Sequence, residues 1–257
     1  MPLLAVDIGN SHTVLGLVRD GDVSASWRIA TDARRTSDDW AIVLRGLLGE
    51  HRDAVEGIAV CSTVPSVLHE WRDMMVRHFA DVPHVVVEPG VRTGVSVLMD
   101  NPREVGSDRI LNALAAATDL GGPAIVVDFG GTATTFDVVN AAGQYVGGAI
   151  APGIEISLEA LGQRGAQLRK VELLRPRSVI ARNTVEALQS GMVFGVAAQV
   201  EGIVSRMIAE LGADPADVRV VATGPLAAVV LDECRCFTGH APWLTLRGLE
   251  LAFARNT

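Results

Sequence analysis

One short segment occurs twice in this chain, and the repetition constrains the fold more than any other feature. Residues 5–18 read AVDIGNSHTVLGLV, and residues 126–139 read VVDFGGTATTFDVV. When Asp7 is aligned with Asp128, the segments match without a gap: glycine meets glycine, hydroxyl residues meet hydroxyl residues, and apolar residues follow. Each copy reads as a strand that ends in aspartate, a tight glycine-containing turn and a second strand. The chain therefore predicts two related lobes.

The order of the expected elements repeats as well. In the first part we expect strands at 3–6, 14–18, 23–29, 57–60 and 84–88, with helices from Thr36 or Ser37 to 48 and at 65–79. In the second part we expect strands ending at 128, 139, 150 and 223, a long helix at 184–211, and helices at the end of the chain. These elements predict an α/β fold of two lobes with mixed sheets and flanking helices, residues 1–117 and 118–257, which face a central cleft.

Composition excludes several classes of protein. The 257 residues carry a formal net charge of −8, whereas a nucleic-acid-binding domain usually has a basic patch. Three cysteines are too few for a disulfide framework and favour a reducing compartment. The N-terminus lacks a basic leader, and no apolar run approaches the ~18 residues of a membrane span. We therefore expect a cytoplasmic protein that binds neither nucleic acid nor membrane.

The repeated turn has the chemistry of a phosphate site. Glycine lets the backbone approach a ligand, and successive N–H groups form a nest for anions. Hydroxyl donors are expected from Ser11, Thr13, Thr132 and Thr134. An aspartate repels phosphate but can contact it through Mg²⁺. A single copy would favour an ordinary hairpin turn, but two copies at the starts of two lobes favour a nucleotide held from both sides.

This arrangement resembles the actin-like ATPase superfamily, whose members include sugar kinases and use two such turns as phosphate loops. The resemblance implies actin-like, or ribonuclease H-like, lobes. The chain contains no G-x-x-x-x-G-K-[ST] sequence, so the site is not a P-loop.

The segment between the lobes, DNPREVGSDRILNALAAA at 100–117, carries candidate catalytic groups. Ser107 is a plausible N-cap of a helix whose first turn contains Asp108 and Arg109. Aspartate is favoured there by the helix dipole, which is sufficient reason for its presence. Arginine is disfavoured at that position, which indicates a role beyond helix stability. Asp108 is a candidate base for a substrate hydroxyl, and Arg109 a candidate ligand of a carboxylate or phosphoryl group.

Six segments in order along almost the whole chain resemble the type III pantothenate kinase family, which catalyses the first step of coenzyme A biosynthesis. They are DIGNSHTVLGL, NPREVGSDRILNA, VVDFGGTATTFDVV, GGAIAPGI, NTVEALQSGMVFG and LTLRGL. The resemblance implies phosphorylation of pantothenate by ATP, with Asp108 as the base. ATP would be bound by Asp7, Ile8, Gly9, Asn10, Ser11, His12, Thr13, Gly130, Gly131 and Thr132.

The same resemblance implies the remaining ligands. Pantothenate would be bound by Met99, Gly106, Ser107, Asp108, Arg109 and Thr184. Asp7 would lie beside Mg²⁺, and Asp128 would help to hold K⁺ or NH₄⁺. Thr184 would reach the substrate across a homodimer interface. The small apolar residues of 193–204 independently favour pairing of the long helix, although burial within one lobe would explain them too.

The chain departs from the family pattern at five places. Gly131 is additional, Met99 stands where tyrosine is common, and Pro225 follows Gly224 in place of a second glycine. Residues 181–184 read ARNT where G-K-N-T is usual, and residues 163–172 also differ. Two alternatives therefore stay open: a catalytically inactive or regulatory homologue, and a kinase for another small hydroxylated acid. His12 has two readings of equal weight, a phosphate contact or an exposed ring.

Overall fold

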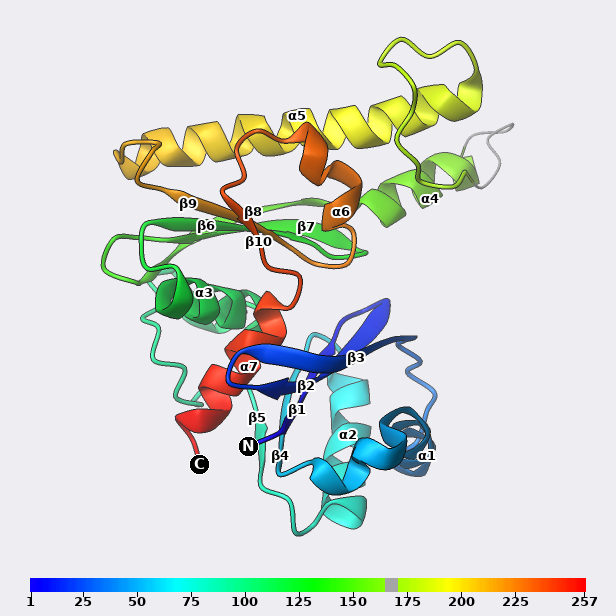
Figure 1. Ribbon diagram of the computed structural model, residues 1–257, viewed down its shortest axis with the longest axis vertical. Helices are drawn as coiled ribbons and strands as arrows, with labels where there is room; N and C mark the ends of the chain where they lie inside the picture. The colour runs from blue at the N-terminus through cyan, green and yellow to red at the C-terminus, as the bar shows by residue number, and fades with distance from the viewer. Residues whose placement is uncertain (165–170) are drawn as a thin grey trace. The chain divides into compact units, whose positions relative to one another are not determined.

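The computed structural model describes residues 1–164 and 171–257. The chain forms two compact units. Unit 1 comprises residues 1–96, 100–115 and 243–257, and unit 2 comprises residues 97–99 and 116–242. Each unit contains a five-stranded sheet with both parallel and antiparallel pairs (Figure 1). The α/β class and the two mixed sheets are thus confirmed.

The sheet of unit 1 has the order β3-β2-β1-β4-β5. Its strands are β1 (Leu3–Ile8), β2 (His12–Arg19), β3 (Asp22–Ala30), β4 (Gly57–Ser62) and β5 (His84–Val86). The central strand β1 is buried along nearly its whole length and reads as an apolar run, whereas exposure alternates along β3. This difference is expected because a central strand is covered on both faces, while a strand with one solvated face shows period-two alternation.

Two helices cover one face of this sheet, α1 (Ser37–Leu48) and α2 (Pro65–His78). Helix α1 starts with a capping box, because the Thr36 hydroxyl accepts from the Asp39 N–H and the Asp39 carboxylate accepts from the Thr36 N–H. The rings of Trp40 and Trp71 lie 5.3 Å apart between the two helices. A 3₁₀ turn, η1 (Gly49–Ala54), follows α1.

Helices α3 (Ser107–Asp119) and α7 (Leu244–Ala254) contribute to the second core of unit 1. A Cβ atom at Gly248 would lie 2.3 Å from the Leu111 carbonyl oxygen, so the two helices touch backbone to backbone at this point. The sequence placed the end of the chain in the second lobe. That assignment is wrong for 243–257, because α7 packs on β1, β2 and β4.

The sheet of unit 2 repeats the first. Its order is β10-β9-β6-β7-β8, formed by β6 (Ala124–Phe129), β7 (Ala133–Val139), β8 (Tyr145–Pro152), β9 (Arg219–Thr223) and β10 (Gly239–His240). Strand β6 pairs antiparallel with β7 and parallel with β9, as β1 does with β2 and β4. The duplicated motif therefore occupies equivalent positions in the two sheets.

The long helix α5 (Thr184–Leu211) runs along one face of this second sheet (Figure 1). Val193, Ala197, Val200 and Val204 pack into the core, together with α4 (Ile154–Arg164), α6 (Ala227–Val230) and η3 (Leu231–Glu233). By length and composition, α5 could also cross a membrane, with 22% of its most apolar window buried. The expectation that no apolar run approaches the length of a membrane span is therefore wrong for α5, judged by length and composition alone.

The N-cap of α3 differs by one position from the predicted one. The structure starts α3 at Ser107, and the Gly106 carbonyl accepts the first helical hydrogen bond from Ile110, so the N-cap is Gly106 rather than Ser107. A short 3₁₀ turn, η2 (Pro102–Glu104), precedes it. Most of the divergent segment 163–172 lies outside the described residues.

Candidate active site

The first turn joins β1 to β2 in unit 1. The strand register pairs Ile8 with Thr13, so residues 9–12 form the turn. The Gly9 N–H donates to the His12 carbonyl at 3.0 Å. The Thr13 side chain is fully buried, and its hydroxyl lies 2.9 Å from that of Thr31. The Thr13 side chain therefore braces the turn and does not face a ligand.

The second turn has the same length and register. Phe129 pairs with Thr134, so the turn contains residues 130–133, including Gly130, Gly131 and Thr132. A Cβ atom at Gly130 would lie 3.2 Å from the Ala133 carbonyl oxygen, and one at Gly9 would lie 3.1 Å from that of His12. The additional glycine thus gives the second turn the geometry of the first.

Asp7, at the end of β1, has a buried thiol beside it. Asp7 and Cys61 are register partners on the parallel strands β1 and β4, and the Cys61 Sγ donates to Asp7 Oδ1 at 3.3 Å. Burial raises the pKa of the Cys61 thiol well above its ordinary value, and the charges of Asp7 and Asp108 raise that pKa further. The thiol is therefore a hydrogen-bond donor at neutral pH, close to both carboxylates.

Asp108 lies in the first turn of α3, folded back over Gly106. A Cβ atom at Gly106 would be 2.4 Å from Asp108 Oδ1, so glycine is required for this carboxylate position. Oδ1 is buried and has no hydrogen-bond partner among the described residues. Burial raises the pKa of Asp108, while the backbone N–H and the charge of Arg109 oppose the rise. A carboxylate oxygen of increased basicity is thus left for a proton donor.

Asp128, at the end of β6 in unit 2, is enclosed by a second glycine turn. Gly224 has φ +88°, a conformation that suits glycine, and a Cβ atom there would lie 2.4 Å from Asp128 Oδ1. On the other side of the second turn, the Gly153 N–H donates to the Thr132 carbonyl at 2.9 Å. These contacts fix the backbone around Asp128.

His12 projects from the start of β2 and contacts Arg28. The Arg28 guanidinium nitrogen lies 3.0 Å from His12 Nδ1 and 3.3 Å from Nε2. The ring therefore contacts Arg28 at the surface of unit 1. This contact does not distinguish between the two predictions for His12, a phosphate contact or an exposed ring.

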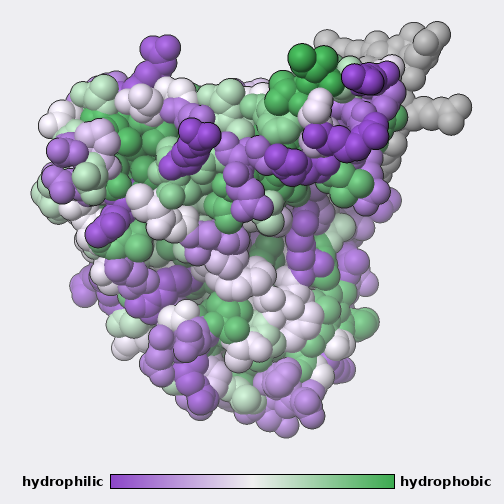
Figure 2. Space-filling model, turned by 45° about the horizontal axis from the view of Figure 1, so that its top comes forward, coloured by the Kyte–Doolittle hydropathy of each residue, from purple (hydrophilic) through white to green (hydrophobic). Residues whose placement is uncertain are grey.

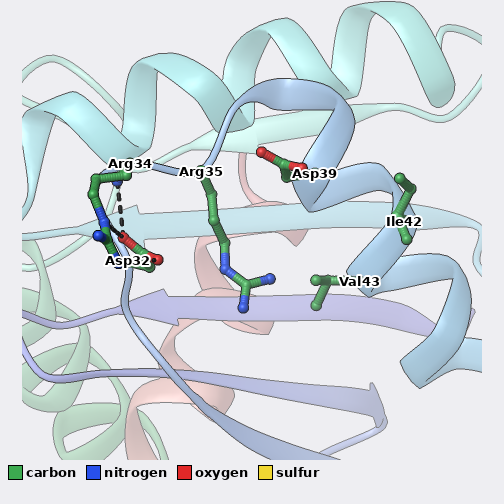
Figure 3. A pocket seen from close by; sticks show the side chains of 6 residues that line it. All are labelled: Asp32, Arg34, Arg35, Asp39, Ile42 and Val43. Carbon is green, nitrogen blue, oxygen red and sulfur yellow. Dashed lines mark hydrogen bonds and ion pairs between the residues drawn. The ribbon is translucent and has the colours of Figure 1, made fainter.

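An open pocket of about 530 Å³ lies where β3 leads into α1, close in sequence to Thr31 (Figure 3). Arg34 is hydrogen-bonded to Asp32, and the Arg35 side chain extends toward Val43 (Figure 3). The Arg35 guanidinium also lies 5.4 Å from the centre of the Trp40 ring. None of these residues belongs to the predicted site.

Two predicted substrate ligands belong to unit 2. Met99 lies next to β8, where a Cβ atom at Gly147 would be 3.2 Å from its sulfur. Thr184 is the exposed first residue of α5, after the N-cap Asn183. The structure therefore brings Asp7, the first turn and Asp108 together in unit 1, and Asp128 with the second turn in unit 2.

Sequence reasoning assigned no role to four residues that support these groups, namely Thr31, Cys61, Gly153 and Gly224. Cys61 carried a detectable signal, since it ends an apolar strand and carboxyl ends of neighbouring parallel strands meet at one edge of a sheet. The two glycines and Thr31 follow strands, and only three-dimensional contacts distinguish them from ordinary loop residues.

The fold places the chain in a class. A Baf family transcriptional activator from Campylobacter jejuni is similar with a TM-score of 0.60, 16% identity and coverage of 98% of each chain. A second similar structure is the activator of 2-hydroxyisocaproyl-CoA dehydratase from Clostridium difficile, solved with bound ADPNP. Its TM-score is 0.52 at 13% identity, and the match covers 99% of this chain and 95% of that one. These likenesses show the fold alone, which is the actin-like fold of two related lobes that the sequence predicted.

The family within that class follows from the sequence. The model of the type III pantothenate kinase family matches residues 3–206. A type III pantothenate kinase from Nocardioides sp. is 78% identical over 256 residues, which cover 100% of both chains. Another from Streptomyces avermitilis is 61% identical, covering 99% of this chain and 98% of the relative. The chain belongs to the type III pantothenate kinase family.

Proposed function

We propose that this chain transfers the γ-phosphoryl group of ATP to pantothenate and forms 4′-phosphopantothenate, the first step of coenzyme A biosynthesis. One structural observation carries the proposal beyond family membership: the buried Oδ1 of Asp108 has no hydrogen-bond partner among the described residues. A buried polar atom without a partner is costly and rare, and such costs are concentrated at functional sites. A substrate hydroxyl would supply the missing donor.

The chemistry assigned to Asp108 is proton removal. As the hydroxyl oxygen of pantothenate attacks the γ-phosphorus, its proton passes to the Asp108 carboxylate, and the bond to the β-phosphate oxygen breaks to release ADP. Burial makes this carboxylate more basic than an exposed one, because the ionised form is disfavoured. Arg109, the next residue, supplies a permanent positive charge for the substrate carboxylate or the transferred group.

The residues present fit the expected cations. No group of three or more His, Cys, Asp or Glu side chains that could hold a metal is found among residues 1–164 and 171–257. Mg²⁺ bound with a nucleotide needs only one or two carboxylates, since phosphate oxygens and water complete its shell. Asp7 is such a carboxylate, and Asp128 is the corresponding candidate for K⁺ or NH₄⁺. Mg²⁺ would neutralise charge on the phosphates.

We also propose that α5 pairs with α5 of a second copy. The exposed face of the helix is a stripe of small residues with spacings of four and three, namely Gly191, Gly195, Ala198, Gly202, Ser205 and Ala209. A glycine inside a helix costs about 1 kcal/mol relative to alanine, so three on one face need a compensating reason. No neighbouring atom lies within 4 Å of a Cβ built at any of the three. Close approach of a partner helix supplies that reason.

A hydrophobic surface continues this face. Leu174, Val179, Ile180 and Val185 are between 50% and 86% exposed, next to the start of α5. Figure 2 shows hydrophobic residues gathered near the grey residues on this face. Exposed apolar groups of this kind are typical of an interface. Pairing here would also bring Thr184 into the interface, as the family resemblance implies.

Two substitutions of matched kind test the dimer. Gly195→Glu would place a charge on the stripe, whereas Gly46→Glu places the same charge on exposed α1, where a Cβ also meets no atom within 4 Å. We expect the unchanged chain and the Gly46 variant to be dimers by light scattering, and the Gly195 variant to be a monomer. A monomeric unchanged chain would exclude the dimer.

The function itself is tested by coupled ADP release with pantothenate and a panel of small hydroxylated acids. We expect turnover with pantothenate that K⁺ or NH₄⁺ supports better than Na⁺. ATP binding without turnover on any acid would favour the inactive homologue, and preference for another acid would identify a different substrate. We place the enzyme in the cytoplasm, in line with three free cysteines.

A further inference from the structure

Thr31 follows β3 and lies outside every sequence motif of the site, yet it makes three hydrogen bonds to the first turn. Its N–H donates to the Ser11 carbonyl at 3.0 Å, and its hydroxyl donates to the Gly9 carbonyl at 2.7 Å. Its Oγ1 also lies 2.9 Å from the Thr13 hydroxyl. Because the single hydroxyl proton of Thr31 goes to Gly9, Thr13 is the donor in the third bond. One residue therefore ties together both ends of the turn.

These bonds determine where the amide groups of the turn point. In a planar trans peptide, the C=O of one residue and the N–H of the next point in opposite directions. Since Thr31 holds the carbonyls of Gly9 and Ser11 on its own side, the N–H groups of Asn10 and His12 are directed to the opposite side. Two donors on one side of a turn are the arrangement that binds a phosphate.

The second turn shows that this side-chain clamp is not a general requirement of the fold. Gly153 occupies the position equivalent to Thr31, because its N–H donates to the Thr132 carbonyl as that of Thr31 donates to Ser11. A Cβ atom at Gly153 would lie 2.5 Å from the Gly131 carbonyl oxygen, so no side chain fits there. Thr134, the counterpart of Thr13, has a buried hydroxyl with no partner in the described part of the chain.

We propose that Thr31 is a positioning residue for nucleotide binding, which holds the first turn with the amides of Asn10 and His12 directed at the phosphates of ATP. This inference rests on the proposed function, because it assigns the turn to ATP. Thr31 itself need not touch the nucleotide. Its hydroxyl acts through the Gly9 carbonyl and Thr13.

The test compares Thr31→Val, which keeps the shape and removes the hydroxyl, with Thr31→Ser, which keeps the hydroxyl. Thr238→Val is the matched control, since the Thr238 hydroxyl both donates to and accepts from Val220 in unit 2. We expect Thr31→Val to raise the KM for ATP about tenfold, with the KM for pantothenate unchanged, because the half-buried Gly9 carbonyl loses its partner. Thr31→Ser should stay within about twofold of the unchanged enzyme, as should the control.

A binding measurement separates this inference from the proposed function. Calorimetry with Mg²⁺ and a non-hydrolysable ATP analogue, without pantothenate, should show the same tenfold weakening in Thr31→Val alone. If the unchanged chain binds the analogue but does not phosphorylate pantothenate, the proposed function fails while this comparison still stands. Equal analogue affinity in Thr31→Val and the unchanged chain would overturn the inference, as would equal weakening in Thr31→Ser or in the control.

Discussion

Replacing Asp108 by asparagine tests two expected consequences of burying this carboxylate: a faster reaction and a less stable fold. The asparagine side chain has nearly the same shape but cannot accept a proton at neutral pH. A positioned general base contributes typically 10²–10⁴-fold to a rate, so we expect kcat to fall by about that factor. The KM for ATP should change little, because Asp108 is assigned to the acceptor hydroxyl.

The same change should stabilise the protein. Burial dominates the pKa shift of Asp108, so the folded state disfavours the ionised form. The folded pKa lies above the unfolded value, and the folded protein therefore holds the proton more tightly. The contribution of Asp108 to the free energy of unfolding is therefore most favourable at low pH. It decreases as the pH rises from about 3.9, the unfolded pKa, through the folded pKa. At pH 8 the full cost of the ionised group is present.

The magnitude follows from the charge on the buried carboxylate. An unsatisfied buried polar atom costs about 1–3 kcal/mol and a charged one costs more, so asparagine, which keeps a polar atom there, removes only the additional cost of the charge, part of which the amide of Arg109 offsets. We expect Asp108→Asn to gain about 1 kcal/mol, which raises Tm by about 2–4 °C for a chain of this size. Thermal unfolding at pH 8 and pH 5 measures this, and the gain should be larger at pH 8.

Gly106→Ala supplies a second perturbation of the same carboxylate. The added Cβ would lie 2.4 Å from Asp108 Oδ1, so the carboxylate must move although its charge remains. We expect lost turnover without the stability gain. Full turnover in Asp108→Asn, or a fall in Tm at pH 8 that matches its fall at pH 5, would refute this account of Asp108.

Two further changes test the groups around the other carboxylates. Cys61→Ala removes the thiol donor to Asp7 and should raise the Mg²⁺ concentration for half-maximal rate several-fold. Cys61→Ser keeps a donor and should leave that concentration near the value of the unchanged enzyme. Cys234→Ala, at another buried thiol, should have no such effect. Gly224→Ala forces a side chain into a backbone conformation with φ +88°, against Asp128 Oδ1. We expect a Tm several degrees lower and a loss of activation by K⁺. Unchanged activation by K⁺ would show that Asp128 does not hold that cation.

Most of the fold could be predicted because local pattern and packing agree in this chain. The duplicated strand–turn–strand segment fixed two hairpins, and the helix-capping residues gave the start of α1. The position of α7 could not be predicted, since sequence order places it after the second sheet. Its assignment to unit 1 follows from its packing on β1, β2 and β4 and from the close fit of Gly248 against Leu111, which are long-range contacts.

For the site, sequence predicted the groups with their own chemistry but not those that hold them. Asp7 and Asp108 were identifiable because a carboxylate at a strand end or helix start is a recognisable pattern. Thr31 and Cys61 act through neighbours on adjacent strands, so their role depends on register. The Thr13 hydroxyl illustrates the same limit: it was expected to face a ligand, yet its proton is used within the turn.

The two departures that most favoured an inactive homologue are both accommodated by the structure. Gly131 extends the second turn to the length of the first, so it removes a difference between the turns instead of creating one. Pro225 lacks an N–H, but the next residue, Leu226, donates to the Phe129 carbonyl at 3.4 Å, and α6 begins directly afterwards. Pro225 precedes the N-cap Leu226 and lies outside α6, so its missing N–H interrupts no helical hydrogen bond. Neither residue therefore disrupts the backbone of the second turn or of the segment that follows β9.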